Sequence, residues 1–318
     1  MSAAPHPMPA LPDPHVLELL APYAPWLGAP DTVFAPANSG VCNISFIVTR
    51  ADGARFVLRQ SRGDDPELGI MRIHEERALR ALSASGLGPE IVAWHPHGHL
   101  LTTYIPHQPV AVDPGAQWLR SAAGVEALAE VLRGFHALPG NGKRFDPARD
   151  IAHRLAWAVD QPAVPVAAAA AIAALAAHVP HARAVADRVA RERPGRAQLV
   201  HGDCFPGNLL HVGDGLRIID VEFSGVGDGL YDLACLGFGL GDEATRELVA
   251  RYEPGSADEV ARTRDALHRY QYLAGVWDAA WALVQLSRAR PGHDYTGHLA
   301  YVVGWANGHP VFTGRSSG

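Results

Sequence analysis

The chain has 318 residues, 48% of them hydrophobic, which is more apolar material than one small core needs, so we expect two lobes with a cleft between them. Its formal net charge is −6 and it has no run of lysine or arginine, which argues against a nucleic acid or a membrane surface as an electrostatic partner. A small polar or charged substrate, bound by a monomer or a homodimer, fits this composition better.

Lys143 is the only lysine in the sequence, so any task that usually falls to lysine must be done by an arginine. The three cysteines are far apart and form no paired spacing, which does not indicate a disulfide framework. The N-terminal segment has no basic stretch before an apolar run, and the longest apolar stretch, 163–177, is rich in alanine and interrupted by Pro165. Neither a secretion signal nor a membrane span is indicated, and we expect a cytoplasmic protein.

The first hundred residues predict an antiparallel sheet accompanied by one main helix. Alternating apolar residues indicate strands, and the turn Asp52-Gly53 joins the first two. Helical spacing that stops at Gly86 indicates a helix between the second and third strands. The expected strands are 43–49, 55–59, 90–94 and 99–104, and the expected helices are 15–20 and 70–84.

Beyond Pro106, helical periodicity dominates. The pattern therefore predicts an α+β fold of two domains: a nucleotide-binding lobe at 1–103, a hinge at 103–106, and a larger, mostly helical lobe at 107–318. The expected helices are 116–137, 147–160, 164–178, 183–193, 242–251, 258–290 and 295–305, with strands only at 199–201, 209–212 and 216–220.

The segment from His201 to Asn208 has the H-x-D-x-x-x-x-N spacing of a kinase catalytic loop. Transfer of a γ-phosphoryl group to an alcohol needs a carboxylate to accept the hydroxyl proton, oxygen ligands for magnesium and a cation on the nucleotide phosphates. The spacing predicts Asp203 as the base, His201 as a second catalytic residue and Asn208 as a metal ligand.

Asp220 ends an apolar strand seventeen positions after Asp203, and Glu222 follows it on the same side of the chain. We expect Asp220 to be the second magnesium ligand, so that ATP and Mg²⁺ are the cofactors. Alternatively, His201 and Asp203 could satisfy loop hydrogen bonds while Asp220 caps a strand. That reading suits a lone H-x-D, but it does not explain why Asn208 and Asp220 accompany it.

Residues 201–234 resemble the choline/ethanolamine kinase family, which belongs to the aminoglycoside phosphotransferase-like group. The resemblance rests on Ile219-Asp220-Val221-Glu222-Phe223-Ser224-Gly225 and Tyr231-Asp232-Leu233-Ala234. In the first lobe, Gly86-Leu87-Gly88-Pro89-Glu90, Gly98-His99-Leu100 and Tyr104-Ile105-Pro106 are similar to its strand and hinge pattern. The resemblance implies a two-lobed, protein-kinase-like fold.

The resemblance also implies a nucleotide site in the first lobe. The phosphate-binding loop falls on Ser39-Gly40-Val41-Cys42-Asn43, although a segment with a single glycine also suits an ordinary turn. Arg59 is the expected strand cation and Glu75 its helix partner, with Glu76 as the competing partner, although both could also be surface charges. The adenine ring is expected against the backbone of Thr103, Tyr104 and Ile105, between Val57 and Ile219.

For the acceptor, the resemblance implies a cage for a quaternary ammonium, which aromatic faces and a carboxylate bind well. Trp277 and Trp281 are one helical turn apart, and we expect them to contact the substrate together with Asp203 and Glu222. Asp278 stands where the family has an aromatic residue, which weakens the case for choline. Two tryptophans at this spacing also suit a helix core.

Two further patterns have simpler readings. Asp232 could contact the substrate or brace the catalytic loop, and bracing is the favoured role. His95, His97 and His99 alternate like metal ligands, but they straddle Pro96 and Gly98 at a hairpin turn without a neighbouring cysteine or carboxylate, so we read them as turn residues.

The leading hypothesis is phosphorylation by ATP of choline, ethanolamine or a related cationic amino alcohol. One alternative is a thiamine or aminoglycoside phosphotransferase on the same scaffold, because the fold does not determine the acceptor. A non-enzyme alternative is a nucleotide-binding pseudokinase, against which the intact Asp203 and Asp220 speak. The sequence leaves open the acceptor, the choice between ATP and GTP, the oligomeric state and the extent of lobe closure.

Overall fold

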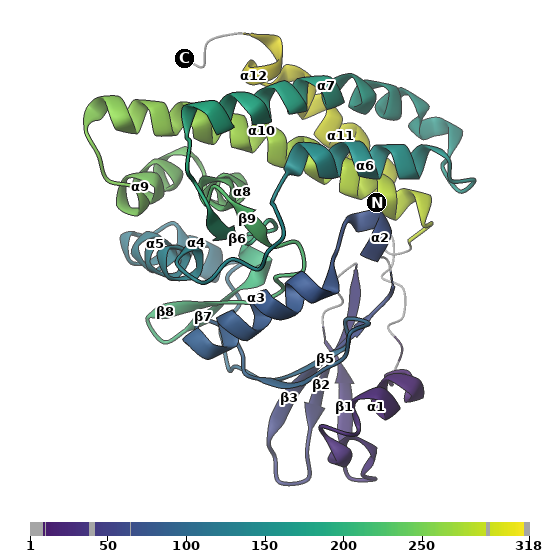
Figure 1. The fold of residues 1–318 in the computed structure, drawn as a ribbon. Coiled ribbons are helices and arrows are strands. Elements are labelled where there is room, and N and C mark those ends of the chain that lie inside the picture. The colour runs from purple at the N-terminus through teal and green to yellow at the C-terminus, as the bar shows by residue number, and fades with distance from the viewer. Residues whose placement is uncertain (1–8, 10, 38–41, 64, 291–292, 315–318) are drawn as a thin grey trace.

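A computed structural model describes residues 9, 11–37, 42–63, 65–290 and 293–314. The chain folds into a smaller lobe built on one antiparallel sheet and a larger helical lobe (Figure 1). This is the two-lobed α+β architecture of the protein-kinase-like fold, so the predicted fold class is confirmed.

The sheet of the smaller lobe has the strand order β1-β2-β3-β5-β4, with every neighbouring pair antiparallel. Helix α1 (Pro14–Leu20) covers one face, where Val16 and Leu20 pack on Phe46 and Leu58. The edge strand β1 was not predicted, because four residues ending in Pro36 give too short an alternation. The strands are β1 Val33–Pro36, β2 Asn43–Thr49, β3 Arg55–Ser61, β4 Ile91–Trp94 and β5 Leu100–Thr103.

Two helices follow β3: the short α2 (Asp65–Leu68) and α3 (Arg72–Ser85). Helix α3 ends at Gly86, whose left-handed φ of 72° suits glycine at a helix C-terminus. Beyond it, the Ile218 N–H donates to the Leu87 carbonyl at 2.8 Å. A Cβ on Gly88 would lie 2.9 Å from the Ile218 carbonyl oxygen. The end of α3 is therefore fixed directly against the other lobe.

The helical lobe differs from the predicted pattern in several places. Strand β9 (Gly225–Gly227) and helix α12 (Pro310–Thr313) were not predicted, because three or four residues are too few to show a period. The helix expected at 116–137 is broken, because the Ser121 side chain accepts from the Gly124 N–H and caps a new helix. The two helices expected at 164–193 are one, which continues through Pro180. Helix α8 was missed because its run is apolar without a helical period. The helices are α4 Gly115–Leu119, α5 Ala122–His136, α6 Pro147–Val159, α7 Ala169–Glu192, α8 Leu230–Leu240, α9 Asp242–Tyr252, α10 Ala257–Ser287, α11 Tyr295–Gly308 and α12 Pro310–Thr313.

Helix α10 is the centre of this lobe and packs against α6, α7, α8 and α11. By length and composition alone, the helix over 166–192 could cross a bilayer, with an 18-residue window of mean hydropathy 1.2. In the structure it lies along α6 and α10 (Figure 1), and its Arg183 pairs with Asp146 at 2.8 Å.

Two small antiparallel pairs hold the loops between the lobes. Strand β6 (Gln198–Val200) pairs with β9 (Gly225–Gly227), and β7 (Leu209–Val212) pairs with β8 (Gly215–Ile218). The loop 201–208 joins β6 to β7, and the segment 219–224 joins β8 to β9. Both loops therefore start and end on paired strands, which fixes them side by side facing the smaller lobe.

Candidate functional site

A cavity of about 580 Å³ lies between the lobes. The predicted hinge residues Thr103, Tyr104 and Ile105 line it, together with Val57 from β3 and Ile219 beyond β8. A flat heterocycle in this cavity would meet backbone at the hinge and apolar side chains from both lobes. Asn43, Arg59, Asn208 and Asp220 line the same cavity. The predicted Ser39 and Gly40 lie outside the described residues.

Arg59 points from β3 toward α3. Its Nη2 lies 2.6 Å from Glu75 Oε1, and both side chains are almost fully buried. Glu76, the competing partner in the sequence, is paired instead with Arg80 at 2.7 Å on the outer face of the helix. Because a buried carboxylate is stable as an ion only when it is paired, Glu75 fixes the guanidinium in the cleft.

The same guanidinium reaches the other lobe. Arg59 Nη1 lies 3.4 Å from Asp220 Oδ1, and Nη2 donates to the Gly98 carbonyl at 3.1 Å. Burial alone would lower the pKa of Arg59, but the carboxylates of Glu75, Glu222 and Asp220 raise it above its usual value. The cation is therefore permanent and available to phosphate oxygens.

Asp203 and Asn208 face each other across the loop between β6 and β7. The Asn208 amide nitrogen donates to the Asp203 carbonyl oxygen at 2.8 Å and to its carboxylate Oδ2 at 3.1 Å. Burial raises the pKa of Asp203, and the nearby carboxylates of Asp220, Glu222 and Asp278 raise it further. A carboxylate with a raised pKa accepts a proton more readily, as a general base requires.

Asp232, from the first turn of α8, holds this loop in place. Its carboxylate accepts hydrogen bonds from the backbone N–H groups of His201 at 2.7 Å and Gly202 at 3.0 Å. The His136 Nε2–H donates to the same carboxylate at 2.9 Å, and all of these groups are buried. This geometry agrees with bracing, since the carboxylate of Asp232 is fully used inside the protein.

His201 joins the two loops of the site. Its Nε2–H donates to the Ile219 carbonyl at 2.9 Å, and its Nδ1 accepts from the Asp203 N–H at 3.2 Å. Both ring nitrogens are therefore occupied by backbone groups in one neutral tautomer. In this arrangement His201 orients Asp203 and Asp220 rather than exchanging a proton with a substrate.

Asp220 has a φ of 63°, a left-handed conformation that is uncommon for a residue other than glycine. This backbone turn directs its carboxylate into the cleft toward Arg59. The carboxylate of Asp220 and the amide of Asn208 are the hard oxygen ligands that Mg²⁺ prefers. The donor set, together with the concentrated negative charge around Asp203, fits a divalent cation.

Glu222 is held by two residues of the smaller lobe. Its Oε2 accepts from Asn43 Nδ2 at 3.1 Å and pairs with Arg72 Nη1 at 3.1 Å. Burial and Asp220 raise its pKa to about 7, while Arg59 and Arg72 oppose the shift. One carboxylate oxygen of Glu222 is therefore engaged across the cleft by residues of the smaller lobe.

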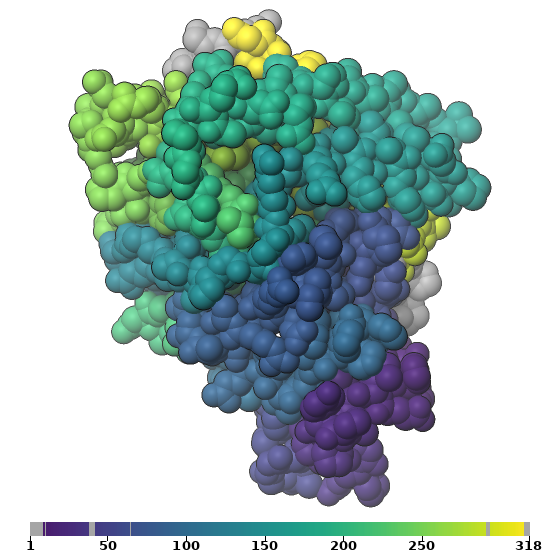
Figure 2. Space-filling view, in the orientation of Figure 1, coloured from purple at the N-terminus to yellow at the C-terminus, as the bar shows by residue number. Residues whose placement is uncertain are grey.

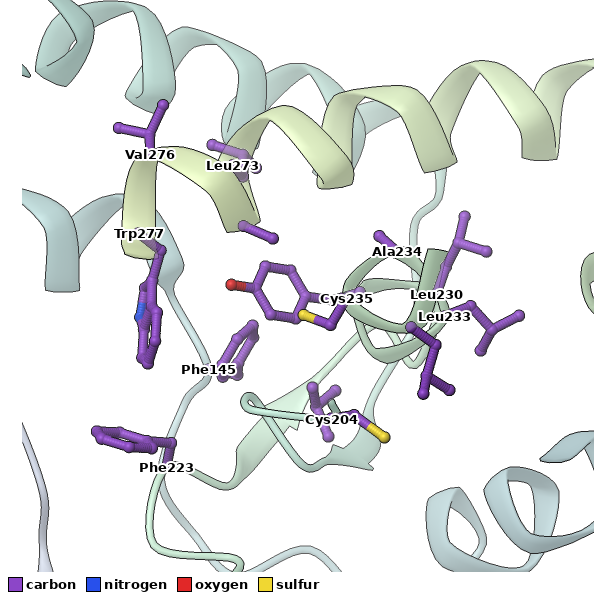
Figure 3. Close-up of a cluster of buried hydrophobic side chains, with 14 of the residues drawn as sticks. Phe145, Cys204, Phe223, Leu230, Leu233, Ala234, Cys235, Leu273, Val276 and Trp277 are labelled. Carbon is purple, nitrogen blue, oxygen red and sulfur yellow. The ribbon is translucent and has the colours of Figure 1, made fainter. Parts of the chain in front are cut away.

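Trp277 is not exposed to a substrate in the way the sequence suggested. Only 4% of it is accessible. The guanidinium of Arg154, from α6, lies 3.8 Å from the centre of its ring. Phe223 packs edge-on at 5.1 Å, and Figure 3 shows Trp277 pointing from α10 toward Phe223 beside Phe145. An internal cation thus occupies the ring face that a cage would offer to an ammonium group.

Trp281 lies half-buried one turn further along α10, and the rings around it belong to α11. Its ring is 5.9 Å from Tyr295 and 6.5 Å from His298, both edge-on. The Asp278 carboxylate accepts from His298 Nε2–H at 2.9 Å. Hydrogen bonding to Asp278 raises the pKa of His298. This corner, formed by Asp278, Trp281, Tyr295 and His298, combines aromatic faces with a carboxylate.

The three histidines of the β4–β5 turn gather at one point, with ligand atoms within 4.8 Å of one another. However, Nδ1 of His95 accepts from the His97 N–H, and Nδ1 of His99 accepts from the Ser61 N–H. Each of these two rings therefore carries its proton on Nε2 when neutral. With one nitrogen hydrogen-bonded and the other protonated, neither ring offers a free lone pair to a metal.

A family model described as "Phosphotransferase enzyme family" matches residues 33–273. The chain belongs to this family. This family membership agrees with the cleft, the paired Arg59 and the Asp203 loop, and it establishes the chain as a small-molecule phosphotransferase. The match extends from the β1 strand to the middle of α10, so it covers both lobes.

Among the relatives of this phosphotransferase is the thiamine kinase of Escherichia coli O157:H7 (strain EC4115 / EHEC), 30% identical over 241 residues that cover 74% of this chain and 75% of the relative. Plasmodium vivax ethanolamine kinase has a TM-score of 0.73 at 15% identity, covering 91% of this chain and 85% of that one. The GDP complex of aminoglycoside 2'-phosphotransferase-IIIa has a TM-score of 0.61 at 18% identity, covering 92% and 97%. At these identities the solved structures support the fold.

The sequence pattern missed several residues that shape the phosphotransferase site. No role was predicted for Arg72 or Arg154, because neither lies in a recognisable motif. The only available signal for Arg72 was its position three residues before Glu75 on a helix, which places both on one face. Tyr295 and His298 come from a helix that approaches Trp281 only in the folded protein.

Proposed function

We propose that this phosphotransferase transfers the γ-phosphoryl group of ATP to the hydroxyl of a small organic cation. The main observation in support of this proposal is the negative charge around Asp203. The carboxylates of Asp220, Glu222 and Asp278 all raise the pKa of Asp203. A cation placed beside the base is stabilised by this field, whereas an anionic alcohol is repelled.

Asp203 accepts the proton of the acceptor hydroxyl while that oxygen attacks the γ-phosphorus. A new oxygen–phosphorus bond forms, the bond to the β–γ bridging oxygen breaks, and ADP leaves. His201 and Asp232 hold Asp203 in place through the loop backbone. Arg59 binds phosphate oxygens, fixed by its ion pair with Glu75.

Asn208 and Asp220 are the residues that would hold Mg²⁺, which neutralises charge on the nucleotide phosphates when bound. The adenine ring lies at the hinge against Thr103, Tyr104 and Ile105, which line the cavity. We propose ATP as the donor over GTP, and side-by-side rates with the two nucleotides test that choice.

Thiamine is the first acceptor to test. Relatives of this chain that are named thiamine kinases are 30% to 32% identical to it over about three quarters of its length. Thiamine also has a flat cationic ring with a primary hydroxyl at the end of a short ethyl side chain, and the ring suits the half-buried Trp281 and the nearby Asp278. Trp277 would then support α10 from within rather than contact the acceptor.

Choline or ethanolamine is the second candidate. The ethanolamine kinase similarity in fold favours it, and the Trp281 corner could also bind an ammonium group. The covered face of Trp277 speaks against a second aromatic wall for a trimethylammonium group. Glu222 remains a candidate substrate contact through the carboxylate oxygen that Asn43 and Arg72 do not use.

A coupled ADP-release assay tests the proposal with thiamine, choline, ethanolamine, homoserine and an aminoglycoside as acceptors. We expect magnesium-dependent turnover that is highest with a cationic alcohol. Turnover highest with an aminoglycoside would replace the acceptor class. Nucleotide binding without turnover on any acceptor, in wild type and in Asp203→Ala alike, would favour a pseudokinase.

We also propose a cytoplasmic location and a monomer or homodimer, in keeping with the small-molecule substrate. Cell fractionation and light scattering on the purified protein test these two points directly.

A further inference from the structure

Arg72 begins α3 at the junction of the two lobes, and no sequence pattern predicts a role for it. Its Nε donates to Asp65 Oδ2 at 2.8 Å, and its Nη2 donates to Asp65 Oδ1 at 2.5 Å and to Ser61 Oγ at 3.1 Å. Its Nη1 donates to Glu75 Oε2 at 2.5 Å and to Glu222 Oε2 at 3.1 Å. One guanidinium therefore binds three carboxylates with all of its nitrogens.

Two of these carboxylates belong to opposite sides of the reaction centre. Glu75 pairs with Arg59, the cation of the nucleotide side. Glu222 belongs to the other lobe, two residues beyond Asp220, and its charge acts on Asp203. In the proposed function it is a candidate contact of the acceptor. Arg72 is thus the shared partner of a nucleotide-side group and an acceptor-side group.

The third carboxylate, Asp65, starts a segment that is bound to the helical lobe. We call residues 65–70 the α2 strap. Its backbone carbonyls at 66, 68 and 69 accept hydrogen bonds from His153 at 2.7 Å, Arg154 at 2.9 Å and Lys143 at 3.1 Å. Glu67 also pairs with Arg288 of α10.

The α2 strap lies away from the hinge and is a separate junction between the lobes. Figure 1 shows α2 directly beside α6, and in Figure 2 the blue segment that contains α2 and α3 lies against the teal helices. Arg154 makes the link more specific, because the same guanidinium that holds Leu68 also stacks on Trp277. The α2 strap is therefore bound to α6, and through Arg154 it is linked to Trp277 of α10.

The chemistry of the Arg72 site calls for arginine. A planar guanidinium has five donors in a fixed fork and can engage Asp65 with two nitrogens while its third faces Glu75 and Glu222. The side chains of Glu75 and Glu222 are 0% and 3% exposed. Without a shared cation, two buried carboxylates would face each other across the lobe junction.

We propose that Arg72 is a positioning residue for phosphoryl transfer, which holds Glu222 in register with the Arg59–Glu75 pair while the α2 strap is docked on the helical lobe. Arg72 touches neither substrate in this role, and the effect on the acceptor rests on the proposed kinase function. Its loss should therefore misplace the acceptor relative to Asp203 while leaving nucleotide contacts at the hinge intact.

The test compares Arg72→Met and Arg72→Lys with the control Arg80→Met, which removes an exposed arginine from the outer face of the same helix. For Arg72→Met we expect kcat/KM for the acceptor to fall by about 100-fold, with a raised acceptor KM, because small misplacements at a reacting centre have effects of that order. The KM for ATP should change by less than about threefold. Arg72→Lys should recover part of the lost kcat/KM, since a lysine ammonium can still pair with a carboxylate although it lacks the planar fork of donors.

A double-mutant cycle with Glu222→Gln makes the readout specific. If Arg72 acts through Glu222, Arg72→Met should lower kcat/KM for the acceptor by a much smaller factor in the Glu222→Gln background than in wild type. Additive effects of the two changes would overturn the proposal. So would a loss of kcat in proportion to the folded fraction, measured by circular dichroism, with both KM values unchanged.

An acceptor-independent measurement separates this proposal from the proposed function. In wild type, MgADP should slow hydrogen exchange in 65–72 and in 219–224, and in Arg72→Met it should slow only 219–224. Equal protection of both segments in the variant would overturn the positioning role. Failure to phosphorylate any acceptor would instead count against the proposed function alone.

Discussion

The two sides of the cleft are built in different ways. The nucleotide side uses backbone at the hinge and apolar side chains from the two lobes. Beside it lies a loop that is held by Asn208, by the Ile219 carbonyl and by Asp232 of α8. The proposed acceptor side is assembled from α6, α10 and α11, and one of its predicted aromatic walls is covered by Arg154. The phosphoryl-transfer chemistry is thus carried by a compact unit, while the acceptor pocket depends on distant helices.

Asp203→Asn should have the largest effect, because it removes the base that serves both sides. We expect kcat to fall by about 10²- to 10⁴-fold, the usual contribution of a general base, while the dissociation constant of MgATP stays close to that of wild type. Steady-state rates and nucleotide titrations measure the two quantities. Asp214→Asn, in the exposed β7–β8 turn, is the matched control, and an equal loss in both variants would contradict the role of Asp203.

Arg59→Met should affect the nucleotide side selectively. It removes the phosphate cation and leaves Glu75 buried without its partner from β3. We expect the KM for ATP to rise by about tenfold or more and the free energy of unfolding to fall by about 3 kcal/mol, as for a broken buried ion pair. Urea denaturation and ATP titration measure these changes. An unchanged KM for ATP in a folded variant would remove Arg59 from the phosphate site.

Trp281→Ala tests the acceptor side, with Trp277→Phe as its counterpart. If Trp281 stacks on the acceptor, its loss should raise the acceptor KM by about tenfold, of the order of one aromatic contact to a cation, with little change in the KM for ATP. Trp277→Phe should mainly lower the melting temperature, because its indole packs on Arg154 and Phe223. If Trp277→Phe raised the acceptor KM while Trp281→Ala changed only the melting temperature, the acceptor would lie at Trp277, which would contradict the roles proposed for the two residues.

The smallest effect is expected from pH at the Trp281 corner. The pKa of His298 is raised by its hydrogen bond to Asp278. The protonated form is therefore favoured in the folded state. Its stabilisation is complete below the ordinary histidine pKa of about 6.5 and is lost as the pH rises through the raised value. Asp278→Asn should remove this dependence, worth less than about 1 kcal/mol for a partly exposed pair.

Melting curves between acidic and alkaline pH check this point, with His97→Gln on the exposed β4–β5 turn as control. A wild-type stability that rises through the same pH range would contradict the sign of the His298 contribution.

Much of the site was predictable because its parts are spaced along one stretch of chain. The pattern from His201 to Asp220 contains Asp203, Asn208 and Asp220, which the structure brings together, and the strand pair that holds them. Glu75 was correctly expected beside Arg59 from the family resemblance. The structure places it on the inner face of α3, whereas Glu76 points outward to Arg80.

The acceptor side was less predictable, because its contacts join residues far apart in the sequence. Trp277 and Trp281 have the same chemistry and the same spacing along α10, yet one is covered by Arg154 and the other lies against Tyr295 and His298. A helix pattern shows which residues share a face, but it does not show which element will pack on that face.

The sequence by itself determined the two-lobed fold, the phosphoryl-transfer loop and the pairing of Arg59 with Glu75. Each of these depends on short-range spacing and on residue chemistry that few alternatives share. Only the tertiary structure decided which aromatic faces remain open, how Glu222 is held from across the cleft and how Arg72 joins three carboxylates. Those outcomes depend on the packing of α2, α6, α10 and α11, and packing is fixed by the whole fold rather than by any one segment.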